Sequence, residues 1–443
     1  MRFFLYLVLS FISARAANPI IPNRGINDPH IRIHEGKAYL FASHDRSIEN
    51  QTFVMDDWRV YSSPDLVNWK LESVVTPEMT YIGKPFSGCW ATDAAFRNSK
   101  CFFYFSEKNQ RTGVMVADSP AGPWRDPLKK PLLGSDLTPT DEYDVCVFQE
   151  DNGTPYIIFG VWDYYIARLN DDMISLAEAP RKLVVHPKFG PYGEGKLDDK
   201  PDLHKANGHY YLSWGCFYAM ADEIYGPYVY QGAVMDAATS FAPGYAAPTW
   251  PKGPLQGRHG NFFSWHNQSY FTYCDISQTG NRYFRDSFIS YVHYKDNGEM
   301  AFVRVDGLGV GQYRSDHGPI EAEDYFKAEG MRKRQISGGG FAVTPGAQGG
   351  SLTFPNIRGI AACNRITLNF TSGGGSGLPV EVRESTTAGR LLATIILRDA
   401  SVNGKLQSLT QLFTAAPSSE TLCFVFPKNT SQIIEFDSFT VEK

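Results

Sequence analysis

The stretch Asp28-Pro-His-Ile-Arg-Ile-His-Glu-Gly-Lys-Ala-Tyr-Leu-Phe41 decides the fold. Apolar and polar residues alternate on both sides of the turn Glu35-Gly36, which is the pattern of a β-hairpin. The same order of polar start, apolar strand, turn and aromatic strand recurs roughly every 50 to 65 residues, at Asp93, Asp144, Asp199 and His259. Strand-rich repeats of this length predict a five-bladed β-propeller. An irregular all-β domain with chance echoes is the alternative.

The composition suits a large folded core. The 443 residues include 30 Phe, 24 Tyr and 8 Trp, and 20% charged residues leave a net charge of −5. These values exclude a disordered chain, a coiled coil and a polybasic nucleic-acid binder. Every Trp lies at or before Trp265, and neither Tyr nor Trp follows Tyr325. Short alternating strands then predict a β-sandwich over residues 320–443, so the expected fold class is all-β throughout.

The N-terminal residues 1–16 have the features of a secretory signal peptide. A basic start is followed by an apolar run and by the small-residue site Ala14-Arg15-Ala16. The run is too short for a transmembrane helix. We therefore expect a secreted, extracellular protein without a membrane span. An acidic secreted protein is expected to bind neutral polymers rather than nucleic acids or anionic lipid surfaces.

Secretion favours disulfides and glycosylation. Seven cysteines follow the signal peptide, so an odd thiol must remain. Cys363 and Cys423 stand alone in the last third of the chain and are predicted to pair, and Cys89 and Cys101 flank a hairpin and are a second predicted pair. Acceptor sequences for N-glycans occur at Asn50, Asn152, Asn267, Asn369 and Asn429.

Several stretches between residues 19 and 314 together carry a family resemblance. They are Asn27-Asp28-Pro29, Cys89-Trp90-Ala91-Thr92-Asp93, Ser119-Pro-Ala-Gly-Pro-Trp124, residues 144–153, Leu169-Asn-Asp-Asp-Met173 and Asn207-Gly-His-Tyr-Tyr-Leu212. This region resembles glycoside hydrolase family 43, which implies a catalytic five-bladed propeller of inverting glycosidase type over residues 17–315. The tail from Ile320 to Phe439 resembles carbohydrate-binding module family 6, which implies a jelly-roll sandwich.

Inverting hydrolysis needs one carboxylate as base for a water molecule and one carboxylic acid for the leaving oxygen. The resemblance implies that Asp28, at the start of the first blade, is the general base; capping of the turn before Pro29 is the alternative. It implies that Asp144 orients the proton donor and raises its pKa by its negative charge. A structural Asp at the start of a strand is the alternative for Asp144.

The proton donor departs from the family pattern of Glu-x-Pro. This sequence reads Asp199-Lys200-Pro201, which shortens the acid by one methylene. The spacing from Asp199 to Asn207-Gly208 repeats that from Asp144 to Asn152-Gly153, so the two acids are predicted to lie at the same depth on the axis. Glu194, in a glycine-rich loop, is the second candidate. A propeller that has lost catalysis is a further alternative.

Four further residues are predicted to lie near the substrate. The resemblance implies that His259 holds a water or a calcium ion near the base and that Arg285 lies near the sugar pocket, where a guanidinium binds carboxylates or hydroxyls. A core histidine and a surface arginine are the alternatives. Trp90 and Phe86, beside the second-blade start, are expected to stack on a sugar; a core position is the alternative for Trp90.

In the tail, the resemblance implies that Glu321, Glu323 and Asp437 hold a structural calcium ion, since hard oxygen ligands suit it. Solvated acids are the alternative. No cofactor is expected for the chemistry.

The predicted function is a secreted inverting glycoside hydrolase that acts on hemicellulose or pectin side chains of plant cell walls. An exo-acting α-L-arabinofuranosidase is the first choice. A β-xylosidase or an exo-enzyme for galactan side chains is the second. A non-catalytic glycan-binding propeller is the alternative from another class.

Overall fold

The computed structural model describes residues 18–247, 250–337, 339–373, 377–397, 406–413, 418–428 and 433–443. The predicted signal peptide and Asn429 lie outside these residues. The described chain is all-β, and its helices are single 3-10 turns at η1 (Pro77–Met79), η2 (Ala322–Asp324) and η3 (Ile360–Ala362). Within this part of the chain, no helix has the length and apolar character needed to cross a bilayer.

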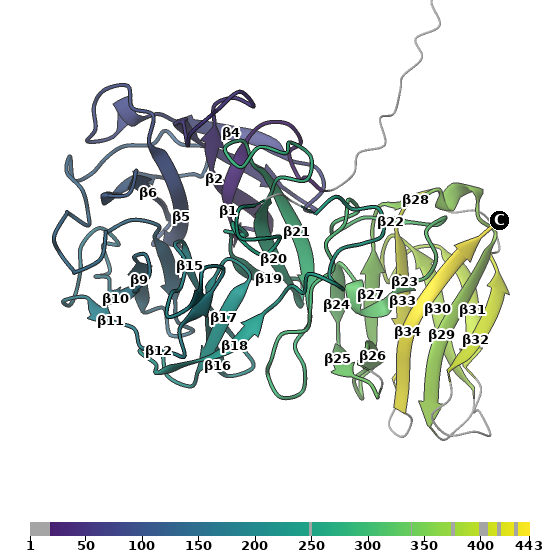
Figure 1. The fold of residues 1–443 in the computed structure, drawn as a ribbon. Helices are drawn as coiled ribbons and strands as arrows, with labels where there is room; N and C mark the ends of the chain where they lie inside the picture. The colour runs from purple at the N-terminus through teal and green to yellow at the C-terminus, as the bar shows by residue number, and fades with distance from the viewer. Residues whose placement is uncertain are drawn as a thin grey trace, which may run out of the picture.

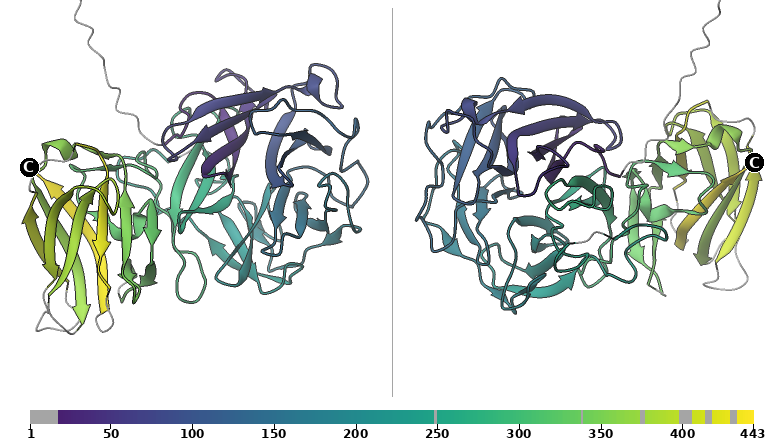
Figure 2. Two further views of the ribbon diagram at one scale, coloured as in Figure 1. Left: turned by 180° about the vertical axis from the view of Figure 1, so that it is seen from behind. Right: turned by 45° about the horizontal axis from the view of Figure 1, so that its top comes forward.

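Five largely antiparallel sheets surround a common centre, as the tilted view in Figure 2 shows, and form the predicted propeller. The first blade contains β1 (Ile26–His34), β2 (Lys37–Asp45), β3 (Met55–Ser63) and β4 (Lys70–Val75), and the second contains β5 (Cys89–Arg97), β6 (Lys100–Glu107) and β7 (Arg111–Ala117). The third contains β8 (Cys146–Gln149), β9 (Pro155–Phe159), β10 (Tyr165–Arg168) and β11 (Arg181–Lys182). The fourth contains β15 (Pro201–Ala206), β16 (His209–Trp214), β17 (Phe217–Ala221) and β18 (Tyr228–Ala233), with β12 (Val185–His186) at its edge, and the fifth contains β19 (Phe262–Trp265), β20 (Gln268–Asp275) and β21 (Asp286–Val292).

The predicted repeat corresponds to the first hairpin of each blade. In four blades the two inner strands are joined by two residues that both have positive φ, at Glu35-Gly36, Asn98-Ser99, Asn207-Gly208 and His266-Asn267. This backbone shape matches the twist of the flanking strands and explains the preference for Asn and Gly. The third blade has a longer connection, from Gln149 to Pro155.

The propeller closes through the start of the described chain. The Asn18 side chain donates to Ile289 O and accepts from Ile289 N, both at 2.9 Å, and Ile20 N donates to Ser287 O. The N-terminal segment therefore lies along β21 and joins the fifth blade to the first.

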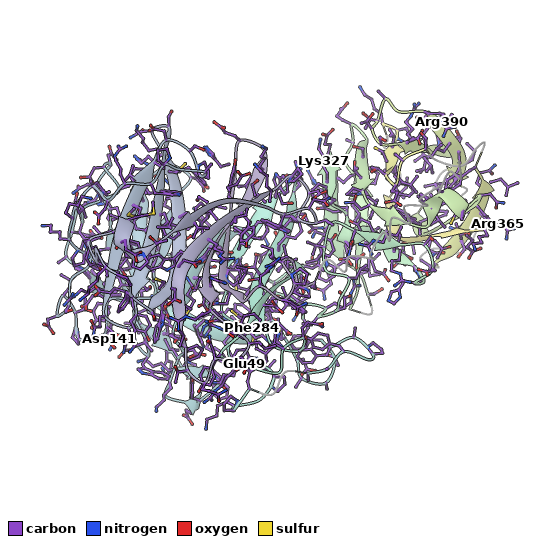
Figure 3. All side chains as sticks on the ribbon, turned by 90° about the horizontal axis from the view of Figure 1, so that it is seen from above. Glu49, Asp141, Phe284, Lys327, Arg365 and Arg390 are labelled. Carbon is purple, nitrogen blue, oxygen red and sulfur yellow. The ribbon has the colours of Figure 1, made fainter. Side chains whose placement is uncertain are left out.

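Two further sheets form the sandwich (Figure 1). One contains β25 (Met331–Gln335), β26 (Phe341–Pro345), β34 (Ile433–Glu442), β29 (Arg365–Gly373) and β32 (Gln407–Leu412), with β23 (Ile320–Glu321) paired to β34. The other contains β24 (Lys327–Glu329), β27 (Gly350–Phe354), β33 (Leu422–Phe426), β30 (Leu378–Glu384) and β31 (Leu391–Leu397). Aromatic residues fill the space between them, with Phe354 and Phe439 at 4.9 Å between ring centroids. In Figure 3, Lys327 lies toward the propeller, whereas Arg365 and Arg390 lie at the far end.

The predicted disulfides are wrong, because all seven cysteines are buried free thiols. In the β5–β6 register Cys89 lies opposite Glu107 and Cys101 opposite Phe96, so the two residues are near opposite ends of the hairpin. Cys363 contacts Gly359 O, whereas Cys423 on β33 contacts the Thr353 hydroxyl. Neither sequence proximity, for Cys89 and Cys101, nor a shared place in the last third of the chain, for Cys363 and Cys423, joined the cysteines.

Candidate active site

A cavity of about 100 Å³ opens at one end of the propeller axis. It gathers most of the predicted site residues from different blades, together with three that the sequence did not suggest. Its lining residues are Asp28, Phe53, Met55, Trp90, Ala91, Asp144, Asp199, His259 and Arg285. Phe86 is not among them, because its ring lies against the Gly88 backbone. Glu194 lies on the short strand β14 (Gly193–Glu194) opposite Phe189, exposed and away from the cavity.

The inner strands are locked together just below this cavity. Four side chains each accept a hydrogen bond from a backbone N–H of the next blade: Asn261 from Ile31, Asp93 from Val147, Cys146 from Leu203 and Asp202 from Phe262. The fifth side chain, His30, contacts Thr92 O. We call His30, Asp93, Cys146, Asp202 and Asn261 the axial ring. Their shared bonding pattern makes them equivalent positions, which fixes the register of all five blades.

This register corrects the predicted alignment of the acids. Two residues before the axial ring lie Asp28, Ala91, Asp144, Lys200 and His259, which we call the cavity ring. Lys200, not Asp199, is therefore the equivalent of Asp144. The prediction failed because the blade-three connection is longer than the two-residue turn of blade four, so equal spacing to Asn-Gly does not mean equal depth.

Asp28 is buried and held by positive groups. Arg285 Nη1 lies 3.0 and 3.2 Å from its two carboxylate oxygens, and the Ser43 hydroxyl donates to Oδ2 at 3.2 Å. Burial alone would raise the pKa of Asp28, but Arg285 and His259 outweigh it and hold that pKa well below its usual range. Asp28 is thus a carboxylate, ready to accept a proton, and it has positive φ, which Asp tolerates.

Arg285 is a buried residue rather than a surface arginine. Its Nε and Nη2 lie 3.1 Å from the Asp45 carboxylate, so it bridges two acids. The guanidinium also lies 5.0 Å below the Phe53 ring. Phe53 meets Trp90 edge to face at 6.1 Å, and together they form an aromatic wall of the cavity. Among the residues that the structure describes, the buried Trp90 indole N–H has no hydrogen-bond partner, so it is available to a ligand hydroxyl.

Asp144 and Asp199 influence each other across the cavity. Burial, followed by the negative charge of Asp199, raises the pKa of Asp144 well above its usual value. Burial also acts to raise the pKa of Asp199, but the His259 charge outweighs it and lowers that pKa. The opposite directions of these pKa shifts make Asp144 the more readily protonated acid of the pair.

His259 lies between the two predicted catalytic acids. Its Nδ1 is 3.5 Å from Asp28 Oδ1 and its Nε2 is 2.9 Å from Asp199 Oδ1. Burial lowers the pKa of His259, but Asp199 and its neighbours raise it well above the ordinary value. One imidazole ring thus separates Asp28 from Asp199, which limits their separation to about 9 Å; inverting glycosidases need roughly 6.5–9.5 Å.

Asp198 is a further acid of this site. Its Oδ1 accepts from Asp199 N at 3.0 Å, and burial together with the charge of Asp199 raises the pKa of Asp198 to about 6. Phe53, Met55 and Asp45 carried no sequence signal, because their place depends on how the β2–β3 connection folds. Asp45 could have been found only from its position at the end of a predicted inner strand.

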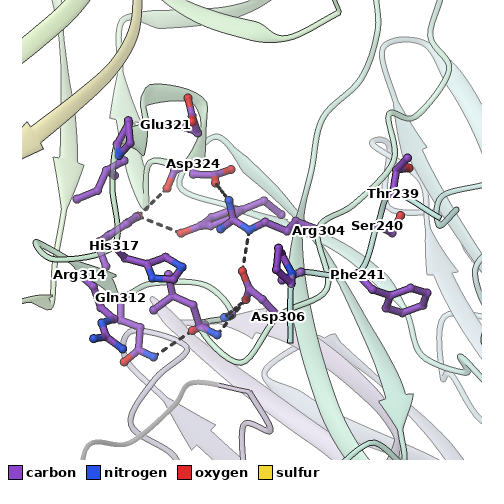
Figure 4. Close-up of a pocket in the computed structure, with 18 residues that line it drawn as sticks. Thr239, Ser240, Phe241, Arg304, Asp306, Gln312, Arg314, His317, Glu321 and Asp324 are labelled. Atoms are coloured by element: carbon purple, nitrogen blue, oxygen red, sulfur yellow. Dashed lines mark hydrogen bonds and ion pairs between the residues drawn. The ribbon is translucent and has the colours of Figure 1, made fainter. Parts of the chain in front are cut away.

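The predicted calcium ligands lie where the sandwich meets the propeller. Figure 4 shows Glu321 and Asp324 beside a cavity of about 300 Å³, with Arg304 between Asp324 and Asp306. Burial and the charge of Asp324 raise the pKa of Glu321 to about 7 and that of Glu323 to about 9. Among the described residues, Glu323 Oε2 has no hydrogen-bond partner although it is buried. This unpaired oxygen fits a hard cation.

Asp437 contributes to the same negative region, since its charge also raises the pKa of both glutamates. Among the described residues, the oxygens of Glu321, Glu323 and Asp437 do not gather within 4.8 Å of one another. Binding of calcium by these three would therefore require their side chains to move together.

Comparison with known proteins agrees with this geometry. The family model of glycosyl hydrolases family 43 matches residues 16–300. The chain belongs to this family. It is 24% identical to an arabinoxylan arabinofuranohydrolase of Bacillus subtilis, with 98% of this chain and 96% of the relative covered, and 29% identical to a xylosidase/arabinosidase of Bacteroides ovatus, with 49% and 80% covered.

A second arabinoxylan arabinofuranohydrolase, from Paenibacillus polymyxa, is 27% identical over 73% of this chain and 58% of the relative. Among solved structures, the family 43 arabinoxylan arabinofuranohydrolase of Bacillus subtilis aligns with a TM-score of 0.56 at 22% identity, covering 96% of this chain and 97% of that one. The chain is therefore a glycoside hydrolase by family, and its fold matches that neighbour over nearly the neighbour's whole length.

Proposed function

We propose that this protein is a secreted, inverting, exo-acting α-L-arabinofuranosidase that removes side chains from plant arabinoxylan. The observation that carries the proposal is the small cavity in which Asp28, Asp144 and Asp199 converge. A cavity of about 100 Å³ suits one terminal sugar rather than a polymer segment. The choice of arabinofuranoside over xyloside is supported by the full-length relatives, whose names specify arabinoxylan arabinofuranohydrolase.

The reaction proceeds in one displacement. Asp28 takes a proton from water as the water oxygen bonds to the anomeric carbon. The bond to the leaving oxygen breaks on the opposite face, and Asp199 gives its proton to that oxygen. Because Asp144 is the more readily protonated acid in the free protein, its proton passes to Asp199 when substrate enters, and the negative charge left on Asp144 then raises the pKa of Asp199. The product sugar therefore carries inverted configuration.

Two features support Asp199 over Glu194 as the donor. Asp199 lines the cavity and lies across one imidazole ring from Asp28, whereas Glu194 is exposed on another strand. The shorter Asp arm is compatible with catalysis if the preceding backbone brings it closer. Misplacement of an acid by about 1 Å costs on the order of 100-fold in rate, so a slow enzyme is the expected consequence of an imperfect fit.

The aromatic wall of Phe53 and Trp90 gives the sugar an apolar surface. Its ring C–H groups pack on these faces while Arg285 and the free Trp90 N–H meet its hydroxyls. The calcium ion proposed at Glu321, Glu323 and Asp437 would only fix the sandwich to the propeller.

A panel of aryl glycosides tests the proposal. Purified protein is assayed with p-nitrophenyl α-L-arabinofuranoside, β-D-xyloside and β-D-galactoside, and with arabinoxylan polymer. We expect the arabinofuranoside to be cleaved with the highest kcat/KM and free arabinose to be released from the polymer. A higher kcat/KM for the xyloside would make the protein a β-xylosidase. No cleavage of any substrate, with retained glycan binding, would make it a binding propeller.

A further inference from the structure

Lys200 is a fully buried lysine on the propeller axis that the proposed reaction does not use. Its Nζ lies 2.9 Å from His30 Nδ1 on β1 and donates to Thr92 O on β5 at 3.0 Å and to Val145 O, next to β8, at 3.3 Å. One ammonium group thus contacts three blades besides its own. An unpaired buried ammonium is costly, so these contacts are a built site for the charge.

The register explains how the side chain reaches this place. Lys200 occupies the cavity-ring position that Asp28 and Asp144 occupy in their blades, and like them it has positive φ. Its long side chain goes down the axis instead of ending in the cavity. Ala91, the cavity-ring residue of the second blade, is small and leaves the axis open at this level.

The charges that surround the ammonium are mainly negative. Above it are Asp28 and Asp144, whose carboxyl groups both experience its charge. Asp93, which pairs with Arg32, also experiences it. His30 bridges toward Asp202 at 3.4 Å, and Cys146 contacts Asp202 at the same distance.

We propose that the Lys200 ammonium is the resident cation of the propeller axis, a positioning residue that ties three inner strands together beneath the cavity and supplies the positive charge under Asp28 and Asp144. Through these contacts it fixes the spacing of the two acids without contacting the substrate. The inference rests on the roles proposed for Asp28 and Asp144.

A chemical rescue experiment tests this role without reference to activity. Lys200→Ala removes about the volume of a propylammonium ion and leaves a charged gap, whereas Lys200→Met keeps the volume and removes the charge. Lys205→Ala, at the far end of the same strand and paired with surface acids, is the matched control. Thermal unfolding is measured with n-propylammonium chloride, with sodium chloride at the same concentration, and with n-propanol.

We expect both Lys200 variants to unfold at lower temperature than wild type. Propylammonium is expected to raise the unfolding temperature of Lys200→Ala by several degrees and to leave Lys200→Met, Lys205→Ala and wild type unchanged. Equal rescue by n-propanol would show that volume rather than charge matters and would overturn the proposal. Absence of rescue, with the variant folded at lower temperature, would also overturn it.

The pH profile of Lys200→Met separates an electrostatic role from a purely structural one. Loss of a positive charge raises the pKa of a neighbouring acid, so the alkaline limb of kcat/KM should move up by about one pH unit. A lower rate with an unmoved profile would contradict the charge role. If the aryl-glycoside panel shows no activity, the thermal experiment still decides about Lys200, so failure of the proposed function is recognised separately.

Discussion

Replacement of Asp28 by Asn is the sharpest test of a single side chain. Asn has nearly the same shape and tolerates the positive φ of this position, so the fold should be kept. It cannot take a proton from water. Loss of a general base costs about 100- to 10,000-fold in rate, or about 3–5 kcal/mol of transition-state stabilisation.

The cost to folding is smaller and can be estimated from the contacts. Arg285 loses a charged partner but keeps the Asp45 carboxylate at 3.1 Å, and the Asn oxygen still accepts a hydrogen bond. Hydrogen bonds to charged groups contribute about 1.5–3 kcal/mol, so the free energy of unfolding should fall by about 1–3 kcal/mol. A protein of this size tolerates such a loss.

The assay compares kcat/KM on p-nitrophenyl α-L-arabinofuranoside with urea unfolding for wild type, Asp28→Asn and Asp45→Asn. Asp45→Asn removes a charge from the same guanidinium but leaves the base, so it should lose stability and less than tenfold in rate. An Asp28→Asn rate within twofold of wild type would refute the base assignment. An equal loss in both variants would mean that the Arg285 charge balance, not proton transfer, limits the rate.

Three further predictions follow from the site. Asp199→Ala should strongly slow cleavage of substrates with poor leaving groups but not cleavage of dinitrophenyl glycosides, because an acidic leaving group needs no proton donor. Glu194→Ala should slow neither reaction by more than about twofold. The reverse pattern would make Glu194 the acid. The kcat/KM of wild type should fall at alkaline pH as the proton held by Asp144 and Asp199 leaves. Asp144→Asn should move this alkaline limb of the pH profile to lower pH, because loss of the neighbouring negative charge lowers the pKa of Asp199. A shift of the limb to higher pH would contradict the assigned coupling. Calcium chloride should raise the unfolding temperature of wild type and not of Glu323→Gln, measured by calorimetry after treatment with a chelator; an equal rise in both would place the ion elsewhere.

Most of the propeller could be predicted because each first hairpin carries its own local signal. Alternation and two-residue turns such as Asn207-Gly208 depend on neighbouring residues only. The convergence of Asp28, Asp144 and His259 could also be predicted from the sequence, because the blades all begin at the same level of the propeller axis. The register of blade four could not be predicted from the sequence, since it depends on hydrogen bonds between blades, such as that from Leu203 N to Cys146 Sγ.

The remaining failures have similar physical causes. The Cys89–Cys101 prediction used sequence proximity, whereas pairing depends on strand register, which placed these two residues near opposite ends of a hairpin. Phe53 was not predicted because it lies in the β2–β3 connection. Long-range contacts set the path of this connection, including the hydrogen bond from the Asn50 side chain to Tyr283 O. The axial place of Lys200 could not be predicted, because nothing local in the sequence marks a residue as axial.

The stereochemistry of the first product tests the central claim most directly. Proton NMR follows the anomeric signals during the first minutes of hydrolysis of an α-L-arabinofuranoside, before mutarotation equilibrates them. A water activated by Asp28 on the face opposite the leaving group predicts that β-L-arabinose appears first. If α-L-arabinose appears first, the reaction proceeds with retention, and Asp28 cannot be the base of a single displacement.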